Sequence, residues 1–218
     1  MRFSDRLRHA AADVWSAQHE HPFVRGIGDG TLDPERFRFY MRQDYLFLIE
    51  YGRFLALACA RAPRLELMEH FAELARSTLR TEMDLHRAYA AEWGIARQHL
   101  ERERPQAATR AYTDFLLRIA ALGDFSELVA ALLPCMWGYC EIGQHLAQRP
   151  RPIEERYVRW IEMYSGDEFA ALAHWCREVC DDAAAGAGTE GRERMQEAFL
   201  ASSHHELHFW EQAWNYAP

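Results

Sequence analysis

The amino-acid sequence predicts an all-α protein built around one core. Apolar side chains recur every three to four residues along most of its 218 residues, which is the period of an amphipathic helix. The strict apolar and polar alternation of a half-buried strand is nearly absent. Proline and glycine residues divide the chain into short segments, and no long linker separates them. We therefore expect a compact bundle of about seven to nine helices in a single domain over residues 1–218.

The first helix and the loop after it are placed by capping residues and breakers. Ser4 has a side chain favoured at an N-cap, and the helix that it opens is expected to run to about residue 20. His21 precedes Pro22, and a residue before proline is biased out of the helical region, so the helix should end there. The glycine-rich stretch 26–30 is expected to form a loop.

The remaining helices follow from the same rules. Asp33 and Pro34 are of the types favoured at the N-cap and the first helical position, and Gly94 is typical of a C-terminal cap. The glycines between residues 186 and 191 mark the loosest segment. The predicted helices span residues 4–20, 34–61, 65–93, 105–122, 126–147, 153–164, 167–185 and 193–214.

A proline lies inside the helix predicted over residues 126–147. Pro134 has no N–H, and its ring crowds the carbonyl four residues earlier, so we expect a kink just before Cys135. The apolar spacing points Cys135 into the core. A thiol beside a kink is a candidate nucleophile, whereas a buried cysteine elsewhere is usually a small apolar core residue.

Acidic and hydroxyl-bearing side chains lie on the apolar faces of several predicted helices. Asp44 and Glu206 each fall inside an apolar stripe, where a carboxylate is rarely buried unless it is paired. Tyr112 and Tyr164 also lie on such faces, although tyrosine is common in cores with its hydroxyl bonded to a carbonyl. Together with Cys135, these residues predict a polar pocket.

The residue types in this pocket suit chemistry on a small nitrogenous heteroaromatic ring. A thiolate is a strong nucleophile, and burial raises the pKa of a carboxyl so that it can act as a general acid near neutral pH. A second carboxylate can accept hydrogen bonds from an amino-substituted ring. Aromatic side chains offer stacking faces for the same ring.

Net charge and composition exclude some classes of partner. The net charge is −8, whereas a nucleic-acid-binding surface needs clustered basic residues that displace counterions. No window approaches the roughly 18 apolar residues that a membrane span requires, and the N-terminus lacks the apolar segment of a signal peptide. The five cysteines lack paired metal or disulfide spacing, so reduced thiols are expected. We expect a soluble cytoplasmic protein without a nucleic-acid or membrane partner.

Short motifs that occur in order along the whole chain carry a family resemblance. They are His21-Pro22-Phe23-Val24, Phe39-Tyr40, Gln43-Asp44-Tyr45, Glu82 and His86 followed by Tyr89, Tyr112, Leu133-Pro134-Cys135 with Tyr139 and Gly143, Trp160-Ile161-Glu162-Met163-Tyr164, and Glu206 before Phe209-Trp210. No single motif is specific, but the ordered set resembles thiaminase II, the TenA-like aminopyrimidine aminohydrolases of thiamin salvage. That resemblance implies a haem-oxygenase-like all-α fold.

The resemblance also implies a reaction. The cysteine matching Cys135 is the nucleophile that adds to a pyrimidine ring, so that the group on the exocyclic methylene can leave before water replaces it. The implied substrate is 4-amino-5-aminomethyl-2-methylpyrimidine, which yields the hydroxymethylpyrimidine and ammonia. Thiamin itself is also cleaved. The family implies a homotetramer and needs no metal or organic cofactor.

The same resemblance implies roles for further residues. The glutamate matching Glu206 transfers protons, and the aspartate matching Asp44 contacts the aminopyrimidine edge. Substrate-lining positions are Tyr112, Tyr164, Tyr139 and Phe47. The family often carries a hydroxyl-bearing ring where this chain has Phe47, so stacking is kept and one hydrogen bond is lost. This difference bears on substrate affinity and on the balance between thiamin and the salvage substrate.

Three other functions are consistent with parts of the sequence. Glu82 and His86 have the i, i+4 spacing of ligands in a di-metal oxygenase of the same fold. The last helix adds further side chains of ligand type: His204, His205, His208 and Glu211. Haem binding through His19 or His21 is a weaker alternative, since a histidine before proline is more often a turn residue. A protein that binds the pyrimidine without turnover is the third.

Overall fold

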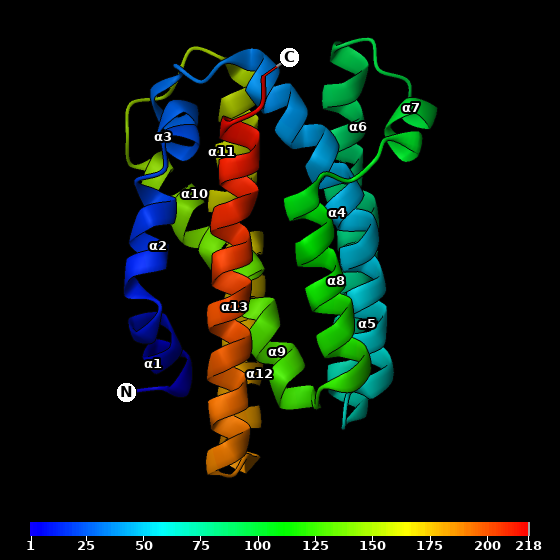
Figure 1. The fold of residues 1–218 in the computed structure, drawn as a ribbon, viewed down its shortest axis with the longest axis vertical. Helices are drawn as coiled ribbons and strands as arrows, with labels where there is room; N and C mark the ends of the chain where they lie inside the picture. Colours follow the sequence, from blue (N-terminus) through cyan, green and yellow to red (C-terminus); the bar gives the residue numbers. More distant parts are fainter. Residues whose placement is uncertain (218) are drawn as a thin grey trace. The chain divides into compact units, whose positions relative to one another are not determined.

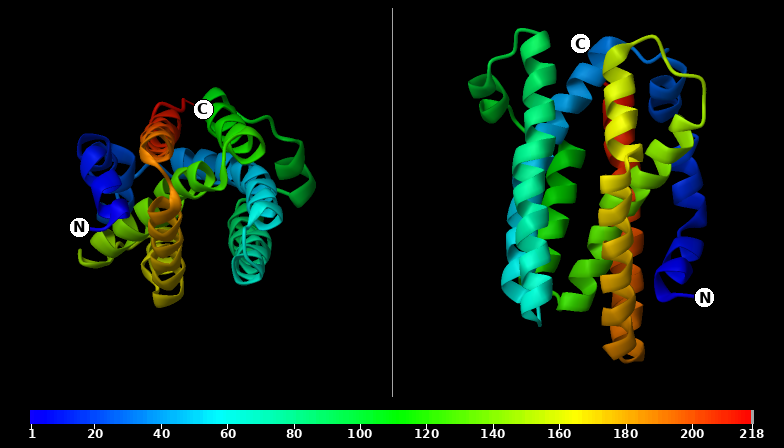
Figure 2. Two further views of the ribbon diagram at one scale, coloured as in Figure 1. Left: turned by 90° about the horizontal axis from the view of Figure 1, so that it is seen from below. Right: turned by 180° about the vertical axis from the view of Figure 1, so that it is seen from behind.

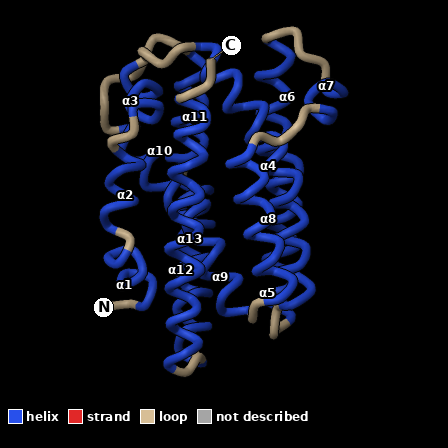
Figure 3. The backbone as a smooth tube through the Cα atoms, viewed as in Figure 1, coloured by secondary structure: helices blue, strands red, loops and turns tan. Residues whose placement is uncertain are grey.

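The structure is a computed structural model that describes residues 1–217 (Figure 1). Within them there are 13 α-helices and two π-helical segments, and no strand occurs (Figure 3). The all-α prediction is confirmed. The predicted count of seven to nine helices is too low, because one predicted helix is divided near Ala11 and short helices form where loops were expected. No helix among the described residues is long and apolar enough to cross a membrane.

The chain groups into two compact units. Unit 1 consists of Met1–Asp33 and Ser126–Asn215, and unit 2 consists of Pro34–Phe125 with the last residues of the chain from Tyr216. The single domain expected over residues 1–218 stays a prediction.

Unit 1 holds the N-terminal helices and the C-terminal part of the chain. Its elements are α1 (Phe3–Ala10), α2 (Ala12–His19), α3 (Pro22–Asp29), α9 (Phe125–Leu133), η2 (Pro134–Gly138), α10 (Tyr139–Ala147), α11 (Glu155–Ser165), α12 (Asp167–Gly186) and α13 (Thr189–Trp214). Helix α10 packs against α11, and η2 packs against both α12 and α13. The π-helical turn is therefore held on two sides by long helices.

Two predictions in the N-terminal part of unit 1 are wrong. Ser4 is not an N-cap: it lies inside α1, where its backbone N–H and its hydroxyl both donate to the Asp181 carboxylate, at 2.7 and 3.1 Å. The stretch 26–30 is not a loop, because Pro22 at the first helical position opens α3 and the His21 ring accepts a hydrogen bond from the Phe23 N–H. Of the three glycines only Gly30 has positive φ, at 73°, and it ends the helix.

Unit 2 is organised around one long helix. Its elements are α4 (Pro34–Arg61), α5 (Leu65–Ser77), η1 (Thr78–Glu82), α6 (Met83–Glu92), α7 (Arg97–Arg102) and α8 (Ala107–Leu122). Helix α4 packs against both α5 and α8. Figure 2 shows that α5, η1 and α6 follow one another as one continuous helical run. The bounds predicted for the first helix of this unit are confirmed, whereas α7 was missed.

Glycine caps were predicted with mixed success. Gly94 follows α6 with φ of 68°, which confirms it as a C-terminal cap. The predicted loose segment at 186–191 shrinks to two residues, since α12 runs through Gly186 and α13 already contains Gly191.

Candidate active site

The helical run that carries Cys135 is interrupted at the predicted place. Helix α9 ends at Leu133, and the π-helical turn η2 begins at Pro134. A proline has no N–H to donate, so the regular α-helical hydrogen-bond pattern cannot continue through it. The structure has a π-helical turn at this place, and the predicted kink just before Cys135 stays a prediction.

Cys135 differs in accessibility from its neighbours. Every residue from 127 to 140 is buried except Cys135, which is half-buried. Its thiol is therefore less enclosed than the apolar spacing predicts. All five cysteines are thiols, and burial, with the charge of Glu141, raises the pKa of Cys140 above its usual value. Partial exposure makes Cys135 a better candidate for a reactive thiol than Cys140, which is buried.

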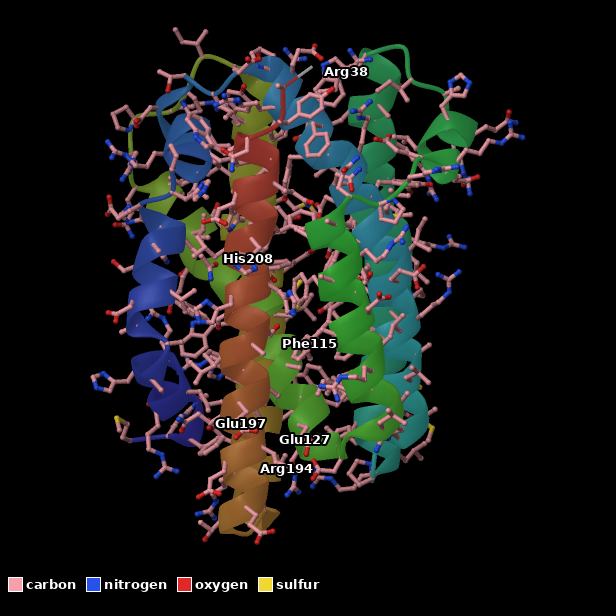
Figure 4. All side chains as sticks on the ribbon, in the orientation of Figure 1. Arg38, Phe115, Glu127, Arg194, Glu197 and His208 are labelled. Atoms are coloured by element: carbon pink, nitrogen blue, oxygen red, sulfur yellow. The ribbon has the colours of Figure 1, made fainter. Side chains whose placement is uncertain are left out.

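Polar side chains of α13 fix this helix against the run that carries Cys135. Ser202 Oγ donates to the Ala131 carbonyl at 2.8 Å, and Arg194 Nε donates to the Glu127 carboxylate (Figure 4). Helix α2 joins the same contact region, since Trp15 Nε1 donates to Ser203 Oγ at 2.9 Å. These bonds hold α13 in register with α9.

Glu206 lies one turn beyond this anchored region. It is 2% exposed, and it follows Ser202 by four residues on α13, just as Cys135 follows Ala131 by four residues on the other helix. Helices α9 and α13 run in the same direction (Figure 1). Unit 1 thus carries a buried carboxyl on α13 and a half-buried thiol on η2, and these two elements pack against each other.

An aromatic cluster fills the adjacent part of unit 1. Tyr139 lies 4.9 Å from Tyr164 and 5.2 Å from Trp210 between ring centroids, and Trp160 lies 4.7 Å from Tyr164. All four rings are buried. The predicted residues Tyr139 and Tyr164 therefore contact each other in one apolar layer.

A glycine permits the close approach that brings these rings together. A Cβ atom added at Gly143 would lie 2.6 Å from the Tyr164 carbonyl carbon and 2.8 Å from the Ser165 nitrogen. We expect Gly143→Ala to separate α10 from α11 and to lower the free energy of unfolding by about 1–3 kcal/mol. Thermal unfolding measures this loss. Gly186→Ala is the matched control, since no atom lies within 4 Å of its added Cβ. Equal stability of the two variants would contradict the role of Gly143.

Unit 2 holds a buried acid and imidazole pair. Asp44 on α4 is 4% exposed and His86 on α6 is 2% exposed, and His86 Nε2 lies 2.8 Å from Asp44 Oδ2. Burial lowers the pKa of His86, but the hydrogen bond and the charge of Asp44 outweigh it, so the net shift is upward. This pairing explains how Asp44 is tolerated inside an apolar stripe.

A second carboxyl lies close to this pair. Glu82, at the end of η1, is half-buried. Its pKa is raised to about 7, first by burial and then by the negative charge of Asp44, while the charge of His86 acts in the opposite direction. Glu82 can therefore hold or release a proton near neutral pH.

The raised pKa of Glu82 predicts a pH-dependent loss of stability. In the unfolded chain Glu82 ionises near 4.5, whereas in the folded protein it ionises near 7. Stability of the native protein should therefore fall as the pH rises through this window, because the folded state binds more protons. One pKa unit corresponds to about 1.4 kcal/mol, and partial exposure reduces the effect, so Glu82→Gln should gain about 1–3 kcal/mol over the native protein between about pH 5 and about pH 8.

Urea unfolding of both proteins at the two pH values measures this difference. A difference that stays constant with pH would contradict it.

Aromatic rings surround the other predicted residues of unit 2. Phe47 lies 5.0 Å from Tyr112 and 5.5 Å from Tyr51 between ring centroids, with the second pair stacked. Asp44 and Phe47 are three residues apart on α4 and so share a helix face. The structure thus brings together a carboxylate and two predicted aromatic residues within this unit.

A family model decides the classification of the chain. The model of the TENA/THI-4/PQQC family matches residues 8–216. The chain belongs to the TENA/THI-4/PQQC family. An aminopyrimidine aminohydrolase of Halalkalibacterium halodurans is similar to it, with 42% identity over 99% of this chain and 96% of the relative.

Solved structures extend the likeness of this family member. A TenA homologue from P. horikoshii OT3 has a TM-score of 0.89 and 32% identity, and the match covers 98% of this chain and 99% of that one. A protein of Shewanella denitrificans OS217, described as having a heme oxygenase-like fold, has a TM-score of 0.74 at 15% identity, over 96% of this chain and 91% of that one. The predicted family and the predicted haem-oxygenase-like fold are confirmed.

The side chains of this TENA/THI-4/PQQC protein do not provide a ready metal centre. No group of three or more His, Cys, Asp and Glu side chains that could hold a metal ion occurs among residues 1–217. His86, one of the ligands considered, instead bonds Asp44 and the Glu82 backbone carbonyl. The donor set needed for the di-metal alternative is therefore lacking in the described part of the chain.

Two surface cavities within the units contain none of the predicted site residues of this family member. Unit 2 has a cavity of about 490 Å³ with charged walls, and unit 1 has one of about 180 Å³. The residues that line the first cavity include Glu50, Arg53, Thr109, Arg110 and Asp114. Neither the candidate thiol Cys135 nor the candidate carboxylates Asp44 and Glu206 line either cavity.

The sequence patterns did not predict that His86 pairs with Asp44. Both residues fall on buried faces, and the cost of burying an unpaired aspartate signals that a partner exists. The partner lies 42 residues away, so helical periodicity could not identify it. The predicted site residues of this family member otherwise divide between the units: Cys135, Tyr139, Tyr164 and Glu206 in unit 1, and Asp44, Phe47 and Tyr112 in unit 2.

Proposed function

We propose that this protein is a thiol-dependent hydrolase of thiamin salvage. It converts 4-amino-5-aminomethyl-2-methylpyrimidine and water to the hydroxymethylpyrimidine and ammonia, and it also cleaves thiamin. The observation that carries this proposal is the half-buried Cys135 on a π-helical turn, in a chain 42% identical to an aminopyrimidine aminohydrolase. Partial access to a thiol in an otherwise buried run is what nucleophilic attack on a ring requires.

The proposed reaction begins at Cys135. The thiolate forms a bond to a ring carbon, and the ring loses aromaticity while a ring nitrogen takes up a proton. The nitrogen on the exocyclic methylene then takes up a second proton and leaves with its bonding pair as ammonia. Water adds to the methylene and gives up one proton as the hydroxyl group forms. Loss of the thiolate and of one proton restores the aromatic ring. Glu206 is the proposed proton-transfer group, because a buried carboxyl can exchange protons in a site from which bulk water is kept out.

The remaining residues are proposed to bind the ring. Asp44 accepts hydrogen bonds from the aminopyrimidine edge, and the aromatic side chains supply stacking faces. Phe47 offers a face without a hydroxyl. The proposed substrate-binding residues are Asp44, Phe47 and Tyr112 of unit 2 and Tyr139 and Tyr164 of unit 1.

Further properties are proposed on the resemblance to the family. The chain acts as a single domain over residues 1–218, assembles as a homotetramer, and works in the cytoplasm without a nucleic-acid partner. It uses no metal or organic cofactor. The net charge of −8 supports the proposal that no nucleic acid is a partner. Sedimentation analysis tests the homotetramer.

Ammonia release from the aminomethylpyrimidine by the native protein tests the function. Continuous release with formation of the hydroxymethylpyrimidine supports the hydrolase, and the same assay with thiamin tests the second substrate. Binding of the pyrimidine without ammonia release would favour a non-catalytic binding protein. About two irons per chain with oxygen consumption would favour the di-metal oxygenase.

A further inference from the structure

The hydrogen bonds of His86 fix which of its ring nitrogens carries a proton. His86 Nδ1 lies 2.8 Å from the backbone carbonyl oxygen of Glu82, one turn earlier on the same helical run. A carbonyl oxygen only accepts hydrogen bonds, so Nδ1 must carry a hydrogen and donate it. The other ring nitrogen, Nε2, is therefore the one that faces Asp44 Oδ2 at 2.8 Å.

This tautomer restricts the hydrogen-bonding role of Asp44. The bond between Nε2 and Oδ2 contains one proton, which belongs either to a positively charged His86 or to a neutral Asp44 carboxyl. In both cases that proton lies between Nε2 and Oδ2. The second oxygen, Oδ1, then carries no hydrogen in either state and can only accept.

Asp44 Oδ1 has no partner of its own within the described chain. Its only hydrogen bond with residues 1–217 is the one that Oδ2 makes with His86. Oδ1 is not one of the fully enclosed side-chain atoms without a partner, so it keeps some contact with solvent. A ligand that covers this oxygen costs free energy unless it supplies a donor. Phe47, three residues further along α4, presents an aromatic ring on the same face. An acceptor beside a ring face suits a planar heterocycle that carries an N–H group.

We propose that His86 is a positioning residue that holds Asp44 with Oδ1 as a fixed acceptor, so that the protein selects pyrimidines bearing a ring amino group. This inference rests on the proposed function, since it assigns the substrate edge to Asp44. A pyrimidine with an acceptor or a bare C–H in place of the amino group leaves Oδ1 buried and unpaired. Such a substrate is rejected through the cost of that unpaired oxygen.

The electrostatics of the pair agree with this role. Burial alone lowers the pKa of His86, yet the hydrogen bond to Asp44 and its negative charge raise it above the usual value. A positively charged imidazole donates from Nε2 to Asp44 Oδ2, which leaves Oδ1 as an acceptor. The backbone carbonyl of Glu82 orients the His86 ring. This contribution does not depend on the Glu82 carboxyl group.

The test compares two substrates in two histidine variants. We expect native protein to prefer the amino substrate over an analogue with hydrogen in place of the ring amino group. In His86→Gln this preference in kcat/KM should fall by about tenfold or more, chiefly through KM for the amino substrate. His70→Gln is the matched control, because His70 Nδ1 makes the same 2.8 Å contact with a carbonyl four residues earlier but is exposed.

A merely structural role for His86 predicts a different pattern. Both substrates would then lose kcat/KM alike, and the ratio would stay at its native value. Coupling to Asp44 gives a second criterion. In the double variant His86→Gln/Asp44→Asn, the loss of substrate preference should be little larger than in Asp44→Asn alone. Additive losses in the double variant would overturn the proposal.

Nitrogen NMR of the folded protein separates this inference from the proposed function. With ¹⁵N-labelled histidine, we expect a protonated Nδ1 in His86 and a change at its Nε2 in Asp44→Asn. This readout needs no turnover, so it stands even if native protein releases no ammonia, which would reject the function alone. An unprotonated Nδ1, or an Nε2 signal indifferent to Asp44→Asn, would overturn the role of His86.

Discussion

Replacing Cys135 with serine should abolish ammonia release from the aminomethylpyrimidine, with a loss in kcat of at least about a thousandfold. A serine hydroxyl remains protonated near neutral pH, whereas a thiol yields a small but usable fraction of thiolate. The substitution changes one atom in a half-buried side chain, so folding should be preserved. Turnover is measured by ammonia release, and stability by thermal unfolding of the same preparation.

Cys140→Ser is the matched control for this experiment. Cys140 lies on the same helical run, but it is buried, and burial raises the pKa of its thiol. We expect this variant to keep turnover within about threefold of the native protein, because little thiolate is available to it. Undiminished turnover in Cys135→Ser would reject covalent catalysis by Cys135. A loss in both variants would point to packing of η2 instead.

Local rules predict this fold well where helix ends depend on neighbouring residues. The bounds of α4 were predicted from Asp33, Pro34 and the apolar period alone, and the structure has the same bounds. Ser4 shows where such rules fail. Its hydroxyl and N–H are bonded to Asp181, 177 residues away, so a side chain typical of an N-cap was used in a tertiary contact.

The π-helical turns show a second limit of sequence patterns. Pro134 signals a break in the α-helical ladder, and η2 begins at that residue. No proline or glycine lies in η1, which the apolar period predicts as continuous helix. A π-helical turn adds one residue to a helix turn and changes which side chains face inward, and its cost is offset by packing that a local pattern does not contain.

The candidate residues were predictable in type but not in their partners. Asp44 on an apolar stripe implied a buried polar contact, and the structure supplies His86 from a helix distant in sequence. The accessibility of Cys135 was also outside the reach of periodicity. A spacing of three to four residues assigns a face, but neighbouring helices decide how much of that face stays covered.

Replacing Glu206 with glutamine should lower kcat by about 10²–10⁴-fold, because an amide cannot transfer the proton that a carboxyl can. Glutamine has nearly the same volume and still forms hydrogen bonds, so the free energy of unfolding should change by less than about 1 kcal/mol. The control is Glu197→Gln, an exposed position on the same helix (Figure 4), which should alter neither quantity. If the fall in kcat, converted to free energy, is similar to the loss in the free energy of unfolding, Glu206 is a structural residue.

Comparing two substrates then assigns the proton that Glu206 moves. The thiazolium of thiamin carries a positive charge and leaves as a neutral ring, so its departure needs no proton. A neutral amine needs one in order to leave as ammonia. If Glu206 protonates the departing nitrogen, Glu206→Gln should impair the aminomethylpyrimidine at least about tenfold more than thiamin. Equal impairment would place Glu206 in a step common to both substrates, such as the activation of the water that replaces the leaving group.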